Sequence, residues 1–178
     1  MRDFNIQSTN FEGVFVLKLK KKKDFRGSLT RYFNFYEISK ILKGKKILHI
    51  NLSENKKKGT MRGFHYQTRP LQEIKLLKCI SGSIYDVIID LRKKSKTYLK
   101  LFKIKLSEHD QKILIIPENF AHGYQTLEKN TKLLYFHTQV YSKKYERTIN
   151  LLDKKLSINW PIKKKIISLK DKKGTILK

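Results

Sequence analysis

Cysteine, proline and tryptophan are scarce in this 178-residue chain. Because Cys79 is the single cysteine, no disulfide can form within the chain, which is typical of a cytosolic protein. Cys79 follows Leu76, Leu77 and Lys78 and is better explained as a small buried residue than as a nucleophile. No apolar run approaches the ~20 residues of a membrane span, and the N-terminus has no apolar signal core. We therefore expect a cytoplasmic protein that is not embedded in a membrane.

Acidic residues are also few, so positive charge dominates: 41 Lys and Arg face 15 Asp and Glu, a formal net charge of +26. Such a chain could hold nucleic acid by counterion release. However, only seven of the basic residues are arginine, which recognises phosphates and bases best. No zinc-finger, helix-turn-helix or ribonucleoprotein motif is present. We interpret the lysines as a solvated surface that steers anionic substrates, and nucleic-acid binding is the less favoured alternative.

Short strand-like segments separated by turn signals fill the chain. The expected strands are Phe15–Leu19 and residues 47–53, 60–67, 74–80, 83–91, 98–106, 112–116, 122–127 and 131–141. Residues 20–27 are expected to form a polar turn. One helix is expected, with Asn34 and Glu37 as a capping box and its end at Gly44. This pattern predicts a single all-β domain over residues 1–178, a jelly roll or small barrel with few helices, whose lysine-rich tail after Trp160 wraps the surface.

Two aspartates lie on one face of the expected strand Ile84–Leu91, because side chains alternate along a strand. Asp86 is expected to point into a semi-apolar interior, where an unpaired carboxylate is costly. It should therefore pair with His65 or Arg62. Asp90 better suits a strand end that faces water.

The hexapeptide Arg62–Gln67 combines a cation, an imidazole and a carboxamide around Gly63. A free imidazole titrates near neutrality, so His65 can exchange protons at cell pH. Arg62 can anchor a phosphate. Strict alternation would put these two side chains on opposite faces, so both can face one cavity only if the strand bulges near Gly63.

The longer segment Gly59–Gln67 resembles the central motif of the dTDP-4-dehydrorhamnose 3,5-epimerase family. Further motifs agree in order and spacing, over about residues 11–171: Asp24–Gly27, Asp86–Arg92, Ile116–Gly123, Tyr141-Ser142, Glu146, Ile158–Pro161 and Ser168–Asp171. The resemblance implies a cupin-type jelly-roll barrel, usually a homodimer, that needs no metal or other cofactor. It also implies a nucleotide-diphosphate 4-keto sugar as substrate, epimerised at C3 and C5 on the way to dTDP-rhamnose. A 4-keto group acidifies both neighbouring carbons, because the departing electron pair delocalises into an enolate.

The resemblance also implies roles for individual residues. His65 is the base, Tyr135 is the acid on the other ring face, and Lys75 supplies a cation for the enolate. Asp171 pairs with His65, with Asp86 as the rival partner and a further candidate at the substrate site. The other implied substrate-binding positions are Arg26, Arg62 and His122 for the diphosphate or nucleotide, Tyr141 for stacking on thymine, His49 and Asn51 in a nucleotide-contact segment, and Glu146 and Lys170.

Arg31 departs from the family pattern, because many members carry glutamate there. The change removes an acceptor and offers a phosphate contact instead, so it leaves the nucleotide and the sugar open. A related branch also carries a basic residue at this position, so we do not interpret Arg31 as inactivating.

Two enzymatic alternatives remain. One is epimerisation at a single carbon, or ketoisomerisation, of a related nucleotide sugar. The other is a metal cupin, whose site needs clustered histidines with a carboxylate. Gln67 stands where a second histidine would be needed, so no metal ligand is assigned.

Overall fold

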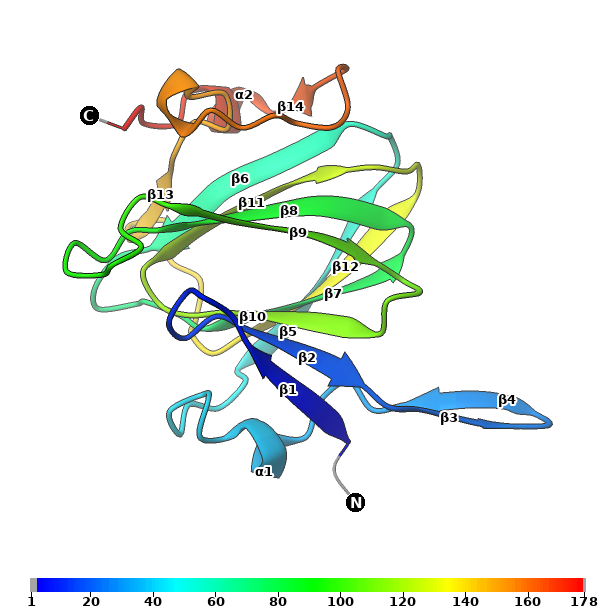
Figure 1. Cartoon of the computed structure of the whole chain (residues 1–178). Coiled ribbons are helices and arrows are strands. Elements are labelled where there is room, and N and C mark those ends of the chain that lie inside the picture. Colours follow the sequence, from blue (N-terminus) through cyan, green and yellow to red (C-terminus); the bar gives the residue numbers. More distant parts are fainter. Residues whose placement is uncertain (1–2, 178) are drawn as a thin grey trace.

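The computed structural model describes residues 3–177 and shows two antiparallel sheets that face each other as a barrel (Figure 1). The first sheet contains, in spatial order, β1 (Phe4–Ser8), β2 (Phe15–Leu19), β10 (Lys112–Ile116), β7 (Lys75–Ser81), β12 (Thr131–His137) and β5 (His49–Asn55). The second contains β13 (Glu146–Thr148), β6 (Thr60–Gln67), β11 (Phe120–Thr126), β8 (Ser83–Asp90) and β9 (Leu101–Ser107), and β14 (Ile166–Ile167) pairs with β6. The expected all-β jelly-roll class is confirmed.

The interior between the sheets is apolar because alternate residues of each strand face inward. Its buried residues include Val16, Leu77, Ile84, Leu114 and Tyr124. Two further clusters cover the outer faces of the sheets. Polar side chains gather at one open end of the barrel, where the site lies.

The expected helix is shorter than predicted and its capping box is wrong. Helix α1 spans only Phe35–Ile38, and the side chain of Asn34 caps nothing. The Glu37 carboxylate instead accepts hydrogen bonds from the backbone N–H groups of Asp3 and Phe4. It therefore ties down the start of β1, a tertiary contact that outweighs the local capping pattern.

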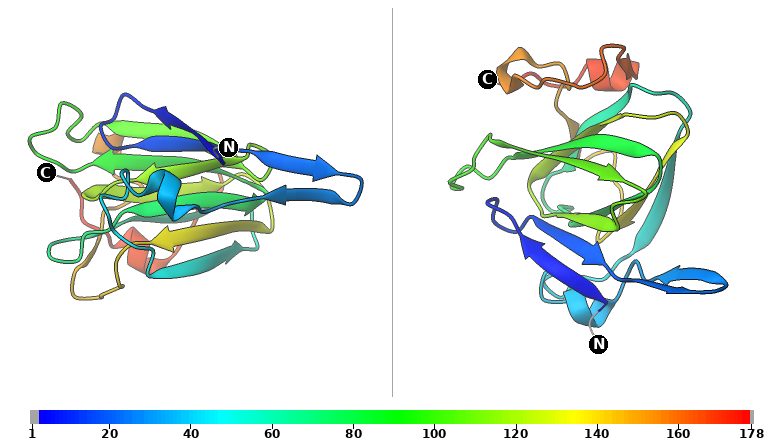
Figure 2. Two further views of the ribbon diagram at one scale, coloured as in Figure 1. Left: turned by 90° about the horizontal axis from the view of Figure 1, so that it is seen from below. Right: turned by 45° about the vertical axis from the view of Figure 1, so that its right-hand side comes forward.

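The expected polar turn at residues 20–27 is also wrong. Lys21–Asp24 forms β3 and Gly27–Thr30 forms β4, a hairpin that stands away from the barrel (Figures 1 and 2). Phe25 at its tip is 98% exposed. These two strands are mostly charged or polar and have no core of their own. Their sequence therefore shows no alternation of apolar residues, and the strands were not predicted.

The C-terminal segment follows the outer face of the second sheet, as expected of the tail. It contains the 3-10 helix η1 (Lys154–Leu156), β14 and helix α2 (Leu169–Lys172). Trp160 packs between Phe64 and Tyr85 and donates a hydrogen bond from Nε1 to the Leu151 carbonyl. Through this anchor the segment lies over β6 (Figure 1).

Strand β6 contains the bulge that the site needs. Opposite β11, His65 pairs with His122 and Arg62 pairs with Tyr124, so two residues on β6 face one on β11. The extra residue lets Arg62 and His65 share a face. A Cβ on Gly63 would lie 2.5 Å from both the Gly123 Cα and the His122 carbonyl oxygen, so only glycine fits here.

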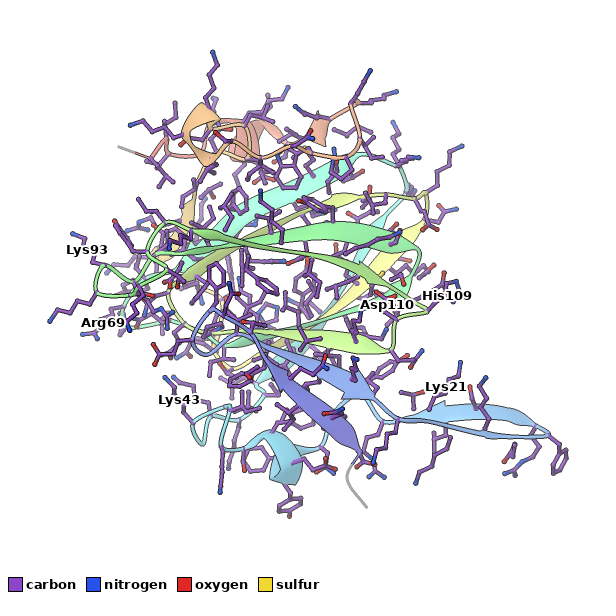
Figure 3. All side chains as sticks on the ribbon, in the orientation of Figure 1. Lys21, Lys43, Arg69, Lys93, His109 and Asp110 are labelled. Atoms are coloured by element: carbon purple, nitrogen blue, oxygen red, sulfur yellow. The ribbon has the colours of Figure 1, made fainter. Side chains whose placement is uncertain are left out.

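Many basic side chains lie on the outside of the barrel. Lys21, Lys43 and Lys93 lie at its periphery (Figure 3). Within residues 3–177, no helix has the length and apolar character needed to cross a bilayer. Burial raises the pKa of the Cys79 thiol to about 11, in line with a packed residue.

Candidate active site

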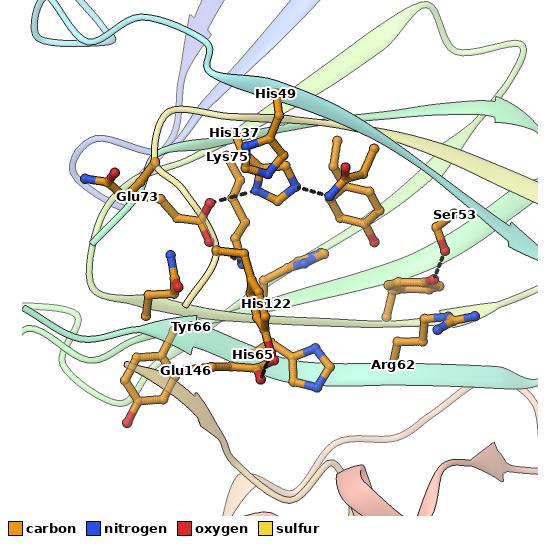
Figure 4. A pocket seen from close by; sticks show the side chains of 16 residues that line it. His49, Ser53, Arg62, His65, Tyr66, Glu73, Lys75, His122, His137 and Glu146 are labelled. Atoms are coloured by element: carbon orange, nitrogen blue, oxygen red, sulfur yellow. Dashed lines mark hydrogen bonds and ion pairs between the residues drawn. The ribbon is translucent and has the colours of Figure 1, made fainter. Parts of the chain in front are cut away.

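A cavity of about 290 Å³ opens at one end of the barrel (Figure 4). Its walls come from β5, β6, β7, β11, β12 and β13 and from the segments that follow β6 and β12. The lining residues are His49, Asn51, Ser53, Arg62, His65, Tyr66, Gln67, Glu73, Lys75, His122, Tyr124, Tyr135, His137, Gln139, Tyr141 and Glu146. Nine of the residues proposed from the sequence therefore meet in one place.

His65 is backed by a carboxylate from the far end of the chain. Its Nε2 lies 2.7 Å from Oδ1 of Asp171. The side chain of His65 is 30% exposed and that of Asp171 is 5% exposed. Burial would raise the pKa of Asp171, but the hydrogen bond and charge of His65 outweigh it and hold the pKa below its usual range. An ionised Asp171 only accepts hydrogen bonds, so Nε2 of His65 carries hydrogen and Nδ1 is left to take a proton.

His122 has a similar partner in a drier place. Its Nε2 lies 2.6 Å from Oδ2 of Asp86, and both side chains are buried. Complete burial raises the pKa of Asp86, against the opposing effect of His122. The expected pairing of Asp86 with His65 or Arg62 is wrong, because in the register of β8 and β11 Asp86 lies opposite Tyr124 and Ile88 lies opposite His122, so His122 is diagonal to Asp86 and reaches its carboxylate. Asp86 lies behind His122 and does not line the cavity.

Asp90 also differs from expectation. It is buried rather than water-facing, and it accepts hydrogen bonds from Arg92 and Thr97. These contacts hold its pKa at about 2 despite the opposing effect of burial. Asp90 therefore anchors the loop after β8 and takes no part in the cavity.

Two tyrosines form the inner wall. Burial, together with Tyr124 and Asp86, raises the pKa of Tyr135 well above its usual value, so its phenol stays protonated. The Tyr135 ring packs edge-on to His122, with ring centroids 5.9 Å apart. The Tyr124 hydroxyl donates to Oδ1 of Asn55. Tyr135 is thus a protonated phenol, held by packing, that is able to donate a proton.

Arg62 is oriented by the same asparagine, because its Nε donates to Oδ1 of Asn55 at 3.0 Å. Arg62 forms no salt bridge among the ion pairs of residues 3–177. Its guanidinium therefore keeps donors for an anionic group in the cavity.

Opposite His65, one carboxylate joins two basic groups. Oε1 of Glu73 lies 3.2 Å from Nζ of Lys75, and Oε2 lies 2.7 Å from Nδ1 of His137. The His137 ring stacks on His49 with centroids 4.5 Å apart, and its Nε2 lies 3.5 Å from Nδ2 of Asn51. The cavity is therefore lined, as expected, by Lys75, His49 and Asn51. They surround the carboxylate of Glu73, which was not predicted to be part of the site.

The mouth of the cavity carries a second shared carboxylate. The Tyr141 hydroxyl and the Lys170 ammonium both donate to Oε2 of Glu146, at 2.9 and 2.6 Å. Burial would raise the pKa of Glu146, but these two contacts hold it below its usual range. The exposed ring of Tyr141 offers a flat surface to a planar ligand.

Two proposed residues neither line the cavity of their own chain nor form a hydrogen bond or ion pair with a residue that lines it. Arg26 lies at the tip of the hairpin, paired with Asp24, and Arg31 pairs with Asp3. Both arginines are exposed. The hairpin carries Arg26 away from the barrel, which no local pattern in the sequence revealed.

Several lining residues were not predicted, although the alternation of side chains along a strand points to them. Ser53 follows His49 and Asn51 along one face of β5, and His137 follows Tyr135 along β12. Glu73 shares a face with Lys75 in the same way. Within residues 3–177, no three His, Cys, Asp or Glu side chains lie close enough together to hold a metal ion.

Chemically, the cavity combines a hydrogen-bonded imidazole, a protonated phenol, a lysine and an arginine. The imidazole can accept a proton and the phenol can supply one. The two cations can stabilise negative charge where water is partly excluded. This set suits proton transfer at carbon in an anionic substrate.

Comparison with known proteins agrees with this chemistry. The family model for dTDP-4-dehydrorhamnose 3,5-epimerase matches residues 8–178. An enzyme of that name from Shigella flexneri is 34% identical over 171 residues, 96% of this chain and 94% of the relative.

Two solved structures share the fold. The dTDP-4-dehydrorhamnose 3,5-epimerase of Bacillus anthracis, crystallised with TDP and PPi, has a TM-score of 0.93 at 33% identity, with 98% of this chain and 99% of that one covered. The dTDP-6-deoxy-D-glucose-3,5-epimerase of Legionella pneumophila, in complex with dTDP-4-keto-L-rhamnose, has a TM-score of 0.91 at 28% identity, covering 97% and 92%. The chain therefore belongs to the dTDP-4-dehydrorhamnose 3,5-epimerase family.

Proposed function

We propose that this protein inverts C3 and C5 of a dTDP-4-keto-6-deoxyhexose, as a step of deoxysugar biosynthesis toward dTDP-rhamnose. One observation carries the proposal: His65, backed by an ionised carboxylate, shares a cavity with the protonated phenol of Tyr135. A base and an acid in one cavity are what inversion at carbon requires. The family membership makes the nucleotide sugar the natural substrate.

In this mechanism His65 removes the proton next to the 4-keto group, and the C–H electron pair moves into an enolate. Asp171 stabilises the imidazolium that forms. Lys75 stabilises the enolate oxygen. Tyr135 then delivers a proton to the opposite ring face and becomes a phenolate. Before the next turn the imidazolium of His65 releases its proton to solvent and the phenolate takes one proton from solvent. The same cycle at the second carbon completes the reaction.

The rest of the cavity would hold the nucleotide. Arg62 and His122 face the interior as donors for the diphosphate, with His49 and Asn51 on the facing strand. Tyr141, braced by Glu146 and Lys170, would stack on the thymine ring. The basic surface would raise the local concentration of this anionic substrate.

Isotope exchange tests the proposal. When the protein turns over the 4-keto sugar nucleotide in D₂O, NMR and mass spectrometry should show two deuterons, one at C3 and one at C5. A single deuteron would support the mono-epimerase alternative, and movement of the carbonyl would support a ketoisomerase. Absence of any exchange would overturn the proposal.

The protein is also proposed to act as a homodimer. Leu48, Ile50 and Leu52 are exposed on or beside β5, the edge strand of the first sheet. The hairpin tip carries the exposed Phe25 beside Arg26. A second copy that packs on this edge would cover the apolar row, and its hairpin would bring Arg26, with Arg31 at its base, toward the open cavity.

Light scattering tests the dimer. We expect the mass of two chains for the wild type and of one chain for an Ile50→Asp, Leu52→Asp variant. Arg26→Ala should weaken dTDP binding in the dimer alone. A monomeric wild type with full activity would contradict this part of the proposal.

We further propose that the protein works in the cytoplasm without a metal or organic cofactor. Cys79 is a free, buried thiol, as in proteins of reducing compartments. Lys75 supplies the cation that the enolate needs, so the chain's own groups account for each proton transfer. Full activity after treatment with EDTA would support this.

A further inference from the structure

The mechanism above gives a role to Lys75 but none to its neighbours Glu73 and His137. Figure 4 shows the three side chains together on one wall, with the Glu73–His137 contact drawn. The Glu73 and His137 side chains are 8% and 13% exposed, and that of Lys75 is also 13% exposed. A carboxylate so placed has a strong effect on whichever cation it contacts.

The carboxylate is ionised although it is buried. Burial would raise the pKa of Glu73, but the hydrogen bond from His137 and the charge of Lys75 outweigh it, so the pKa lies below its usual value. An ionised Glu73 accepts hydrogen bonds from both neighbours.

The two contacts of Glu73 are unequal. The distance to Nδ1 of His137 is 2.7 Å, whereas the distance to Nζ of Lys75 is 3.2 Å. His137 therefore takes the closer hydrogen bond and leaves Lys75 more loosely held. A lysine held in this way can turn toward an enolate oxygen, whereas a tight ion pair would keep it on the carboxylate.

His137 is itself braced for this task. Its ring stacks on His49 on one side, and Asn51 Nδ2 faces its Nε2. An amide donor at Nε2 favours the tautomer with hydrogen on Nδ1, which is the hydrogen that Glu73 accepts. Burial and the nearby His137 lower the pKa of His49, so the stacked ring tends to stay neutral.

We propose that Glu73 and His137 are positioning residues for Lys75: Glu73 holds the ammonium at the cavity wall, and His137 takes the closer contact with Glu73 so that the ammonium can reach the enolate. The inference rests on the proposed function, because it concerns the lysine that stabilises the enolate. It assigns a task to two side chains outside the roles given above to His65, Tyr135 and Asp171.

A double-mutant cycle tests the inference. Glu73→Gln keeps the shape and removes the charge, and we expect kcat to fall about 10- to 100-fold, as for a misaligned catalytic group. The KM should not rise, since a negative charge is removed near an anionic substrate. His137→Ala should also lower kcat, because Glu73 then holds Lys75 alone.

The decisive readout is the Lys75→Ala background. If Glu73 and His137 act through Lys75, their substitutions should change kcat less than about twofold once Lys75 is gone. Equal losses in both backgrounds would overturn the inference, because a merely structural role does not depend on Lys75. Binding of dTDP by calorimetry shows that each variant remains folded and able to bind.

Glu54→Gln is the matched control. Glu54 pairs with Lys132 on the exposed face of β5 and β12, so the substitution removes the same charge from a Lys–Glu pair outside the cavity. It should leave kcat unchanged. Deuterium uptake by the wild type separates the two claims. If the wild type takes up no deuterium, the proposed function fails. If it does, but the substitutions at Glu73 and His137 have the same effect with and without Lys75, only the positioning role is refuted.

Discussion

Two imidazole–carboxylate pairs lie side by side on β6 and β11, where His65 and His122 are cross-strand partners. Their contact distances, 2.7 and 2.6 Å, are nearly equal. Their surroundings differ. The first pair reaches solvent and joins the barrel to helix α2, whereas the second lies wholly inside the barrel.

The difference shows in the carboxylates. The pKa of Asp171 lies below its usual value and that of Asp86 lies above it, because burial dominates at Asp86. A pair that readily bears charge suits a base that cycles through imidazolium. A pair that resists charge suits a fixed hydrogen-bond donor. Burial, more than the identity of the residues, separates the two tasks.

The largest expected effect comes from removing the imidazole of the first pair. His65→Ala should lower kcat and deuterium uptake by about 10³-fold, within the range of general-base catalysis. NMR in D₂O measures this. His109→Ala is the control, since that histidine is exposed outside the cavity. The assignment of different tasks to the two pairs would be wrong if His122→Ala abolished deuterium exchange while His65→Ala left it nearly intact.

The next effect concerns the phenol. Tyr135→Phe should lower product formation by about 10²-fold, because the proton for the second ring face is lost. Exchange catalysed by His65 should fall less, so the ratio of exchange to epimerisation should rise. An equal fall of both rates would mean that Tyr135 does not act separately from the base.

Stability against pH distinguishes the two carboxylates directly. The pKa of Asp171 is lowered on folding, so its charge stabilises the fold above about pH 3.8, and that stabilisation is lost as pH falls through the folded pKa. Asp171→Asn should therefore lower the Tm near pH 6 but have little effect near pH 3.

Asp86 should behave in the opposite sense. Its pKa is raised on folding, so the folded state binds more protons and stability falls as pH rises above about 3.8 toward the folded pKa. The Tm of the Asp86→Asn variant, compared with that of the wild type at the same pH, should therefore increase as the pH rises over this range. Thermal melts between pH 3 and 7 measure both variants, and curves of the same sign would refute the distinction.

The smallest effect lies at the mouth, away from both pairs. Tyr141→Ala should weaken dTDP binding about fivefold, since an aromatic contact is worth about 1 kcal/mol. At saturating substrate, kcat should be nearly unchanged. Calorimetry with dTDP measures the loss, with Tyr36→Ala, an exposed tyrosine on α1, as the control.

Much of the barrel could be predicted from the sequence, because its strands are short segments rich in apolar and aromatic residues between turn signals. The expected strands at Phe15–Leu19, 60–67 and 112–116 coincide with β2, β6 and β10. The hairpin β3–β4 could not be found in this way, because it packs against no core within its own chain.

The cavity was predicted in part, and the misses share a cause. His65 and Lys75 could be placed from motif spacing, and both line the cavity. The partner of Asp86 depended on the register between β8 and β11, which no local pattern encodes. Glu73 and His137 meet across neighbouring strand ends, so their contact also required the sheet order.

Gly63 links the two pairs mechanically. Any side chain there would press on the His122 carbonyl, 2.5 Å from the new Cβ, and would shift the strand that carries His65 as well. A single substitution at this position would therefore disturb both imidazoles at once, the solvent-facing pair together with the sealed one.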